Sequence, residues 1–338
     1  MRGGILKYEH KDNAIEKNIS ILKAIAIISV ISAHSNRIIN GNNNQFELLF
    51  SKLLNQFGVV GVAIFFVLSG YLFYLDKTPF LLFVKKKLTR IILPWFITGT
   101  LVYLYIIIRK GNFSLISYIN YLIGNGSYLY YLSLLVIFYL VFYNFRNNSL
   151  FLCGVVFISF MNIILLESIH VNNVINPYLN PLNFAFYFSI GILISKYNLY
   201  KPILNYTYRF RYLLMGGYIG AIIYLTLNGI HLVYWRPIII LMQLLAILFI
   251  LSISNHRLIT NDFTIDIGKE SFSIYLLHMP IVGITIYLLD MINLWMLFPL
   301  RPFIILIFTY HFIKCYKRIS DTRFNKFSKE LKMLIGTK

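Results

Sequence analysis

Two polar side chains in the first apolar segment could do chemistry together. Lys23 and His34 are eleven residues apart, and eleven helical steps of about 100° return to within about 20° of the starting direction with a rise of about 16 Å. The two side chains therefore share one helix face at two depths. Lys23 could hold an anion and His34 could act as an acid or base. The alternative is that Lys23 snorkels to the lipid interface and His34 is a polar interface residue.

Lys87 and Arg90 form a second pair of candidates. They are three residues apart in a basic run that leads into Pro94, so we expect them to be neighbours at the start of a helix. Backbone N–H groups and the helix dipole favour phosphate at such a helix N-terminus. The pair therefore predicts an anion site, with an ordinary cytoplasmic cluster of basic residues as the alternative.

A third group of polar residues lies in a later apolar segment. Ser271, Tyr275 and His278 fall along one helical stripe, and Pro280 would loosen the helix beside the histidine. Tyr275 and His278 are therefore candidate catalytic or substrate-binding residues. A structural histidine is the alternative.

Ser69 is a further candidate in the second apolar segment. It shares a helix face with Gly61 and Phe65 at steps of four. Small residues on such a face let two helices approach closely. Packing explains most of this pattern, and the hydroxyl of Ser69 remains a candidate contact.

The composition indicates how these residues are positioned. Of the 338 residues, 58% are hydrophobic and 13% are charged, whereas a soluble domain is about 45–50% apolar and about 25% charged. We therefore predict an all-α, polytopic integral membrane protein with about ten transmembrane helices. Their expected bounds are 19–37, 55–75, 86–108, 126–145, 148–166, 180–195, 211–229, 234–253, 271–290 and 296–316. The uncharged stretch 111–145 leaves room for an extra re-entrant piece near Ile116–Ile123.

The placement of basic residues predicts the orientation. A formal charge of +19 would suggest a nucleic-acid partner in a soluble protein. With the N-terminus inside, however, 24 Lys and Arg residues fall on the inner side and 6 on the outer side. Basic residues accumulate on the cytoplasmic side, so we expect both termini in the cytoplasm and no nucleic-acid partner. The expected organisation is a cytoplasmic segment 1–18, a transmembrane domain 19–316 and a basic cytoplasmic tail 317–338 at the inner leaflet.

The expected spans lack central carboxylates, and the chain lacks known metal and nucleotide motifs, which disfavours several classes of chemistry. None of the 12 acidic residues lies near the middle of a span, whereas proton pumps and many ion-coupled transporters use mid-membrane carboxylates. A Ser-His-Asp arrangement would also lack its orienting acid. The chain contains no Walker loop, HExxH or paired CxxC motif, so we predict no metal site and no permanently bound cofactor. Cys153 and Cys315 lie in apolar sequence and are predicted to be buried free thiols.

Four motifs occur in order along the chain. They are Lys23-x10-His34, Gly61-Val62-Ala63-Ile64-Phe65-Phe66-Val67-Leu68-Ser69-Gly70, Lys87-x-x-Arg90 before Ile91-Ile92-Leu93-Pro94-Trp95, and Ser273-Ile274-Tyr275-Leu276-Leu277-His278-x-Pro280. Together they resemble the membrane acyltransferase type 3 family over almost the whole chain. The resemblance implies a multi-pass enzyme of the bacterial plasma (inner) membrane. Such enzymes move acyl groups, most often acetyl from acetyl-CoA, to sugar hydroxyls of surface or exported glycans.

The resemblance also implies roles for individual residues. His34 matches the histidine used in catalysis and Lys23 matches its basic partner. Lys87 and Arg90 match the basic pair associated with the acyl donor, and His278 matches a motif position of less defined role. One departure concerns Ala63, because many members carry an acidic or other residue there. Because this chain has alanine at position 63, it has no acid there that could orient a histidine.

The expected activity is O-acyl transfer from acyl-CoA to a glycan or lipid-linked sugar. His34 would be the general base or the acyl carrier, and Lys23 would hold donor phosphate or stabilise developing negative charge. Two other classes remain open. A transporter or flippase of a lipid-linked glycan would show inverted repeats and mid-membrane ion ligands, which we do not find in the sequence. A non-catalytic scaffold is the third reading, and acetyl transfer by the purified protein would exclude both.

Overall fold

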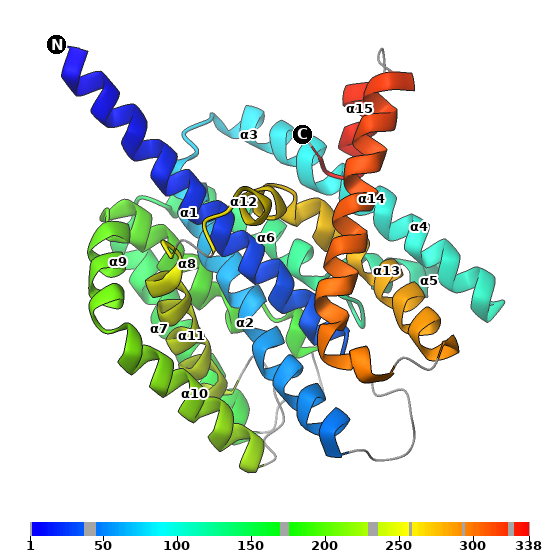
Figure 1. Cartoon of the computed structure of the whole chain (residues 1–338). Helices are drawn as coiled ribbons and strands as arrows, with labels where there is room; N and C mark the ends of the chain where they lie inside the picture. Colours follow the sequence, from blue (N-terminus) through cyan, green and yellow to red (C-terminus); the bar gives the residue numbers. More distant parts are fainter. Residues whose placement is uncertain are drawn as a thin grey trace.

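The computed structural model in Figure 1 describes residues 2–36, 45–169, 176–228, 236–256, 259–292, 295–323 and 328–337. Every regular element in these ranges is helical. The α-helices are α1 (Arg2–His34), α2 (Gln45–Leu75), α3 (Phe80–Lys87), α4 (Leu93–Lys110), α5 (Leu115–Ile123), α6 (Tyr130–Phe145), α7 (Ser149–Ile169), α8 (Leu182–Lys196), α9 (Tyr200–Arg209), α10 (Arg211–Leu227), α11 (Pro237–Ile253), α12 (Asp262–Lys269), α13 (Ser271–Met291), α14 (Arg301–Arg323) and α15 (Ser328–Leu334). A π-helical turn, Leu88–Ile92, joins α3 to α4, and 3-10 turns occupy Pro177–Leu179 and Trp295–Leu300. The all-α prediction is confirmed for the described part of the chain.

Five helical stretches among the described residues are long and apolar enough to cross a membrane. They are 48–75, 80–108, 177–196, 271–289 and 297–322. A sixth results if α9 and α10, which meet at an angle of 80°, form one broken span. Three more expected spans correspond to shorter apolar helices, at Tyr130–Phe145, Ser149–Leu165 and Pro237–Ile253. Ten spans therefore remain a prediction. Some of the positions used for it, including Arg37 and Arg257, lie outside the described residues.

Several helix bounds differ from those expected. The helix α1 begins at Arg2, so the polar segment before residue 19 continues the first span as helix. The helix α2 begins at Gln45, ten residues before the expected start at residue 55. A hydropathy window detects where a helix becomes apolar, whereas the backbone hydrogen bonds extend through polar residues as well. The separate short helix α5 occupies the place left for an extra piece between the third and fourth expected spans.

The helix α2 lies at the centre of the fold, between α1 and α8 (Figure 1). Glycines allow its close contacts on both sides. A Cβ atom at Gly61 would lie 2.4 Å from the carbonyl oxygen of Ala26 in α1. A Cβ atom at Gly191 in α8 would lie 2.0 Å from the carbonyl oxygen of Val67 in α2. These contacts place backbone against backbone, which only glycine permits.

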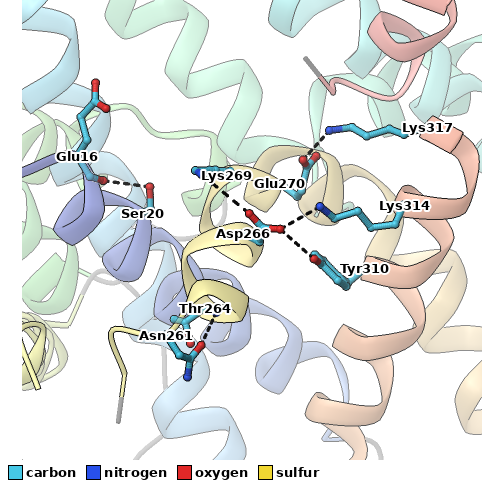
Figure 2. A network of polar contacts seen from close by, with 10 residues as sticks. All are labelled: Glu16, Ser20, Asn261, Thr264, Asp266, Lys269, Glu270, Tyr310, Lys314 and Lys317. Atoms are coloured by element: carbon cyan, nitrogen blue, oxygen red, sulfur yellow. Dashed lines mark hydrogen bonds and ion pairs between the residues drawn. The ribbon is translucent and has the colours of Figure 1, made fainter. Parts of the chain in front are cut away.

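Polar contacts connect α12 to α14, as Figure 2 shows. The side chain of Asn261 accepts a hydrogen bond from the Thr264 amide and caps α12. Asp266 accepts hydrogen bonds from Lys314 at 3.0 Å and from Tyr310 at 3.2 Å, both in α14. The hydrogen bond from Lys314 is the main cause of the lowered pKa of Asp266.

A second ion pair and a glycine complete this connection. Glu270 pairs with Lys317 of α14 at 2.5 Å, and both side chains are largely buried. A Cβ atom at Gly268 would lie 1.8 Å from the Ser20 carbonyl oxygen of α1. The helix α12 therefore holds the start of α13, which carries Tyr275 and His278, in register with α1.

The prediction that the two cysteines are buried is wrong. Cys153 and Cys315 are free thiols, but both are exposed on the surface of the chain. They lie on helix faces that no other described helix covers. Apolar sequence around a residue in a membrane protein does not distinguish a protein-facing position from a lipid-facing one, because lipid tails are as apolar as Leu side chains.

Candidate functional site

His34 and His278 come together although they lie on different helices. The centroids of the two rings are 5.2 Å apart, with their planes tilted by 46°. His34 ends α1 and remains half-buried, whereas His278 in the middle of α13 is fully buried. A substrate approaching this pair would therefore meet His34 first. The two histidines that the sequence predicted separately form one site.

The hydrogen bond of His278 defines its tautomer. Its Nδ1 lies 2.6 Å from the carbonyl oxygen of Tyr275, and a carbonyl oxygen can only accept, so we assign the proton to Nδ1. Nε2 is then the lone-pair nitrogen, and it is buried without a hydrogen-bond partner in the described residues. The ring of His278 thus presents a proton acceptor within a site that contains the second imidazole of His34.

Pro280 contributes to the site through the carbonyl group that it leaves unpaired. Because proline has no N–H, the carbonyl oxygen of Leu276 four residues earlier has no partner within α13. The hydroxyl of Tyr128, from the loop before α6, donates to this oxygen at 2.9 Å. In return the hydroxyl of Tyr275 donates to the carbonyl oxygen of Tyr128. This reciprocal pair fixes α13 against the start of α6, and α13 continues through the proline to Met291.

A row of tyrosines connects the histidines to the basic residues. The ring of Tyr128 lies edge-on to His278 with centroids 5.2 Å apart, and Tyr131 lies 5.5 Å from Tyr275. The hydroxyl of Tyr131 also lies 3.0 Å from that of Ser69 in α2. Tyr139, two turns along α6 from Tyr131, reaches Lys87. Ser69 therefore takes part in the site through Tyr131 as well as in helix packing.

Lys87 occupies the other end of this row. Its Nζ lies 4.2 Å from the ring centroid of Tyr139 and 4.9 Å from that of Phe83, which are cation–π distances. The charge of Lys23 in α1 acts electrostatically on Lys87, so these lysines of two different motifs lie within electrostatic range of each other.

The prediction that Lys87 and Arg90 lie at a helix N-terminus is wrong. The helix α3 runs from Phe80 to Lys87, so Lys87 is its last residue. The free N-terminal amides of this helical stretch are therefore at Phe80 and not at Lys87. A π-helical turn, Leu88–Ile92, follows and widens the chain path between the two basic residues. As a result Lys87 is half-buried against the aromatic rings while Arg90 is exposed. Such single π-turns occur frequently at functional sites.

The turn before α3 determines where Lys87 lies. Asp76 accepts hydrogen bonds from the backbone and hydroxyl of Thr78 and pairs with Lys86 at 2.9 Å. Tyr143 of α6 donates a hydrogen bond to the carbonyl oxygen of Thr78, and Arg146, at the end of α6, donates one to the carbonyl oxygen of Asp76. Burial alone would raise the pKa of the Asp76 carboxyl, but its hydrogen bonds from Thr78 and Lys86 lower that pKa to about 2. The carboxylate therefore stays ionised at neutral pH, and its contribution to stability is lost only as the pH falls from about 4 towards 2.

Three site residues were missed from the sequence. Tyr128, Tyr131 and Tyr139 lie in a chain with 26 tyrosines, and nothing in their spacing distinguishes them from packing residues. A weak signal did exist at Pro280, because the carbonyl oxygen that it leaves without an N–H needs an external donor.

The fold and the site together define a multi-pass helical membrane protein with a pair of imidazoles, one half-buried and one fully buried. A family model described as an acyltransferase domain matches residues 16–313, so the chain belongs to the membrane acyltransferase type 3 family. The match includes both histidines and the basic residues Lys23, Lys87 and Arg90. No curated protein and no solved structure matches the chain. The protein is therefore a membrane acyltransferase.

Proposed function

We propose that the protein moves an acetyl group from acetyl-CoA to a hydroxyl of a cell-surface or exported glycan, or of its lipid-linked precursor. The observation that supports this most is the pairing of His34 with His278, with rings 5.2 Å apart, in a member of an acyltransferase family. A histidine is the side chain best suited to take a proton from a hydroxyl near neutral pH.

In the proposed step, the lone-pair nitrogen of His34 accepts the proton of the sugar hydroxyl. The sugar oxygen attacks the thioester carbonyl carbon, a C–O bond forms and the C–S bond breaks. The thiolate of CoA leaves and takes up the proton that His34 had gained. An acyl-histidine intermediate on His34 is the close variant. His278 acts as a positioning residue, because an acceptor at its Nε2 can hold an N–H of His34 and so select the His34 tautomer.

The basic residues are proposed to hold the donor. Lys23 and Lys87 lie within electrostatic range of each other, and Lys23 and His34 are separated by a rise of about 16 Å along α1. The phosphates of CoA would bind at the lysines, and its extended pantetheine arm would carry the thioester along the tyrosine row to the histidines. Arg90, being exposed, would contribute through its charge at the entrance.

We also propose the orientation that the basic residues predict. The chain would cross the bacterial plasma (inner) membrane ten times, with Lys87 towards the cytoplasm, where acetyl-CoA is made, and His34 towards the outer side. Both termini would be cytoplasmic, because 24 of the basic residues fall on that side. A reporter fused at the C-terminus should be active only in the cytoplasm. Activity of the reporter outside the cytoplasm would contradict the orientation.

The function is tested with the purified protein and labelled acetyl-CoA. We expect the protein to release free CoA and to place the label on a glycan acceptor when membranes containing such glycans are supplied. A transporter, a flippase or a scaffold would consume no acetyl-CoA. Absence of CoA release, in protein that elutes as a single species and with acceptor present, would contradict the proposal.

Replacing Lys87 should weaken donor use. Lys87→Ala removes a charge-assisted contact worth about 1.5–3 kcal/mol, so we expect the KM for acetyl-CoA to rise about tenfold to a hundredfold while the acceptor KM stays near its original value. Lys85→Ala is the matched control, because it removes the same charge from an exposed position of α3. The Lys87→Ala, Arg90→Ala double variant should have a still higher KM for acetyl-CoA. An unchanged KM for acetyl-CoA in the double variant would contradict a role in donor binding. Both residues would then serve only to set the orientation of the chain in the membrane.

A further inference from the structure

An apolar pocket lies apart from the histidine site. It is lined by ten aliphatic side chains and two tyrosines from α1, α2, α8, α9 and α11, and encloses about 520 Å³ that no atom fills, part of it open to the surroundings. The lining residues are Ile19, Leu22, Ile64, Val67, Leu68, Tyr71, Ile194, Tyr200, Ile203, Ile247, Ile250 and Leu251. A sugar or nucleotide would find no charged or amide partner on these walls. The pocket therefore suits a hydrocarbon guest.

One polar atom of the pocket wall is available to a ligand. The side chain of Tyr200 is only 9% exposed, and its hydroxyl makes no hydrogen bond within the described residues although the Asn18 side chain lies near it. A buried hydroxyl without a partner has a free-energy cost that a bound acceptor would remove. An ester carbonyl oxygen is such an acceptor.

The helix α9 beside the pocket has the features of an interfacial helix. It meets α10 at 80°, so it lies close to the membrane plane if α10 crosses the bilayer, and Figure 1 shows the turn between them. Tyr206 and Tyr208 are 65% and 56% exposed, as aromatic residues are at the headgroup level. Ile203 of the same helix lines the pocket. In that orientation the pocket would lie next to the lipid headgroups.

The charge around α9 is positive. Lys201 and Arg209 are exposed on α9, and Arg211 follows with its guanidinium carbon 4.4 Å from the ring centroid of Tyr208. The sequence contains no Asp or Glu from residue 168 to residue 261. Basic residues at this level attract anionic lipid headgroups, by about 1 kcal/mol each.

We propose that the pocket binds a fatty acyl chain of an anionic glycerophospholipid, with the phosphate held at the basic end of α9, where Arg209 is exposed. The hydroxyl of Tyr200 would donate to a glycerol ester carbonyl. This site is independent of the proposed acyl transfer.

The test measures lipid binding to the delipidated full chain by native mass spectrometry. Phosphatidylglycerol and phosphatidylcholine with the same chains are added back separately. We expect phosphatidylglycerol to bind at least fivefold more tightly. Ile203→Phe, which fills the pocket from α9, should weaken its binding at least tenfold, whereas Ile223→Phe at an exposed position of α10 should not change it. Arg209→Gln should reduce the preference for phosphatidylglycerol and leave phosphatidylcholine binding unchanged.

A second pocket-filling variant guards against an unfolded Ile203→Phe protein. Leu251→Phe fills the same pocket from α11 and should weaken binding to a similar extent. Both variants are compared with the wild type after each has been shown to elute as a single species. Equal binding of the two lipids by the wild type, or unchanged binding of phosphatidylglycerol in a folded pocket-filling variant, would overturn the proposal.

Discussion

His34→Ala is expected to abolish acetyl transfer while the protein still inserts and folds. A positioned general base contributes about 10²–10⁴ in rate, and no described carboxylate faces His34 to replace it. The ring of His34 is half-buried at the end of α1, so its removal leaves no large cavity. The measurement is the rate of acetyl transfer from acetyl-CoA by variants matched for expression and for elution as a single species.

Two further histidine variants separate catalysis from packing. His311→Ala removes an exposed histidine from α14 and should retain the wild-type rate. His278→Ala should lower kcat by less than His34→Ala, leave the donor KM unchanged and shift the pH profile of kcat, because His278 acts through the protonation of His34. If His34→Ala retained near wild-type turnover while His278→Ala lost it, the catalytic role would belong to His278.

Gly191→Ala is expected to have a large destabilising effect. The added Cβ would lie 2.0 Å from the carbonyl oxygen of Val67, and a backbone atom cannot rotate away as a side chain can. Overpacking in a close-packed interior costs about 1–3 kcal/mol and occasionally more, and we expect at least the upper end here. We predict a thermal midpoint lowered by several degrees in detergent, together with a smaller monodisperse fraction.

Gly154→Ala is the matched control for this variant. Gly154 lies in α7, and a Cβ there would meet nothing within 4 Å. Alanine is favoured over glycine in a helix by about 0.8–1 kcal/mol, so the control should be neutral or slightly stabilised. A Gly191→Ala protein as stable as this control would show that α2 and α8 do not pack as closely as described.

The class of the protein and its main motifs could be predicted from the sequence. Apolar stretches with few charges predict membrane helices because burying an ionisable group in lipid is costly. The family assignment followed from four short motifs and is confirmed by the match to residues 16–313. The expected 271–290 span agrees with α13 within one residue. Helix starts were less accurate at Arg2 and Gln45, because helical hydrogen bonding continues through polar residues. The apolar residues 80–84, which begin α3, lie before the expected start of the third span.

The contacts within the site could not be predicted in this way. The helical repeat placed Lys23 and His34 on one face, since a local period depends only on neighbouring residues. The meeting of His34 with His278, 244 residues later, depends on how α12 joins α1 to α14. The inward position of Lys87 and the outward position of Arg90 depend on one π-turn that leaves no clear mark in the sequence.

The properties that could be predicted from the sequence are therefore those that depend on composition or on neighbouring residues. The sequence determined the helical class, the apolar segments and the facing of residues within one helix, because these properties follow from side-chain transfer energies and the 3.6-residue period. The tertiary structure was needed to show which helices meet, that the thiols of Cys153 and Cys315 are exposed, and that Tyr131 and Tyr139 of α6 contact Tyr275 and Lys87. The physical reason is that these outcomes depend on contacts between residues far apart in the chain, where many arrangements bury similar apolar area and glycine contacts select one of them.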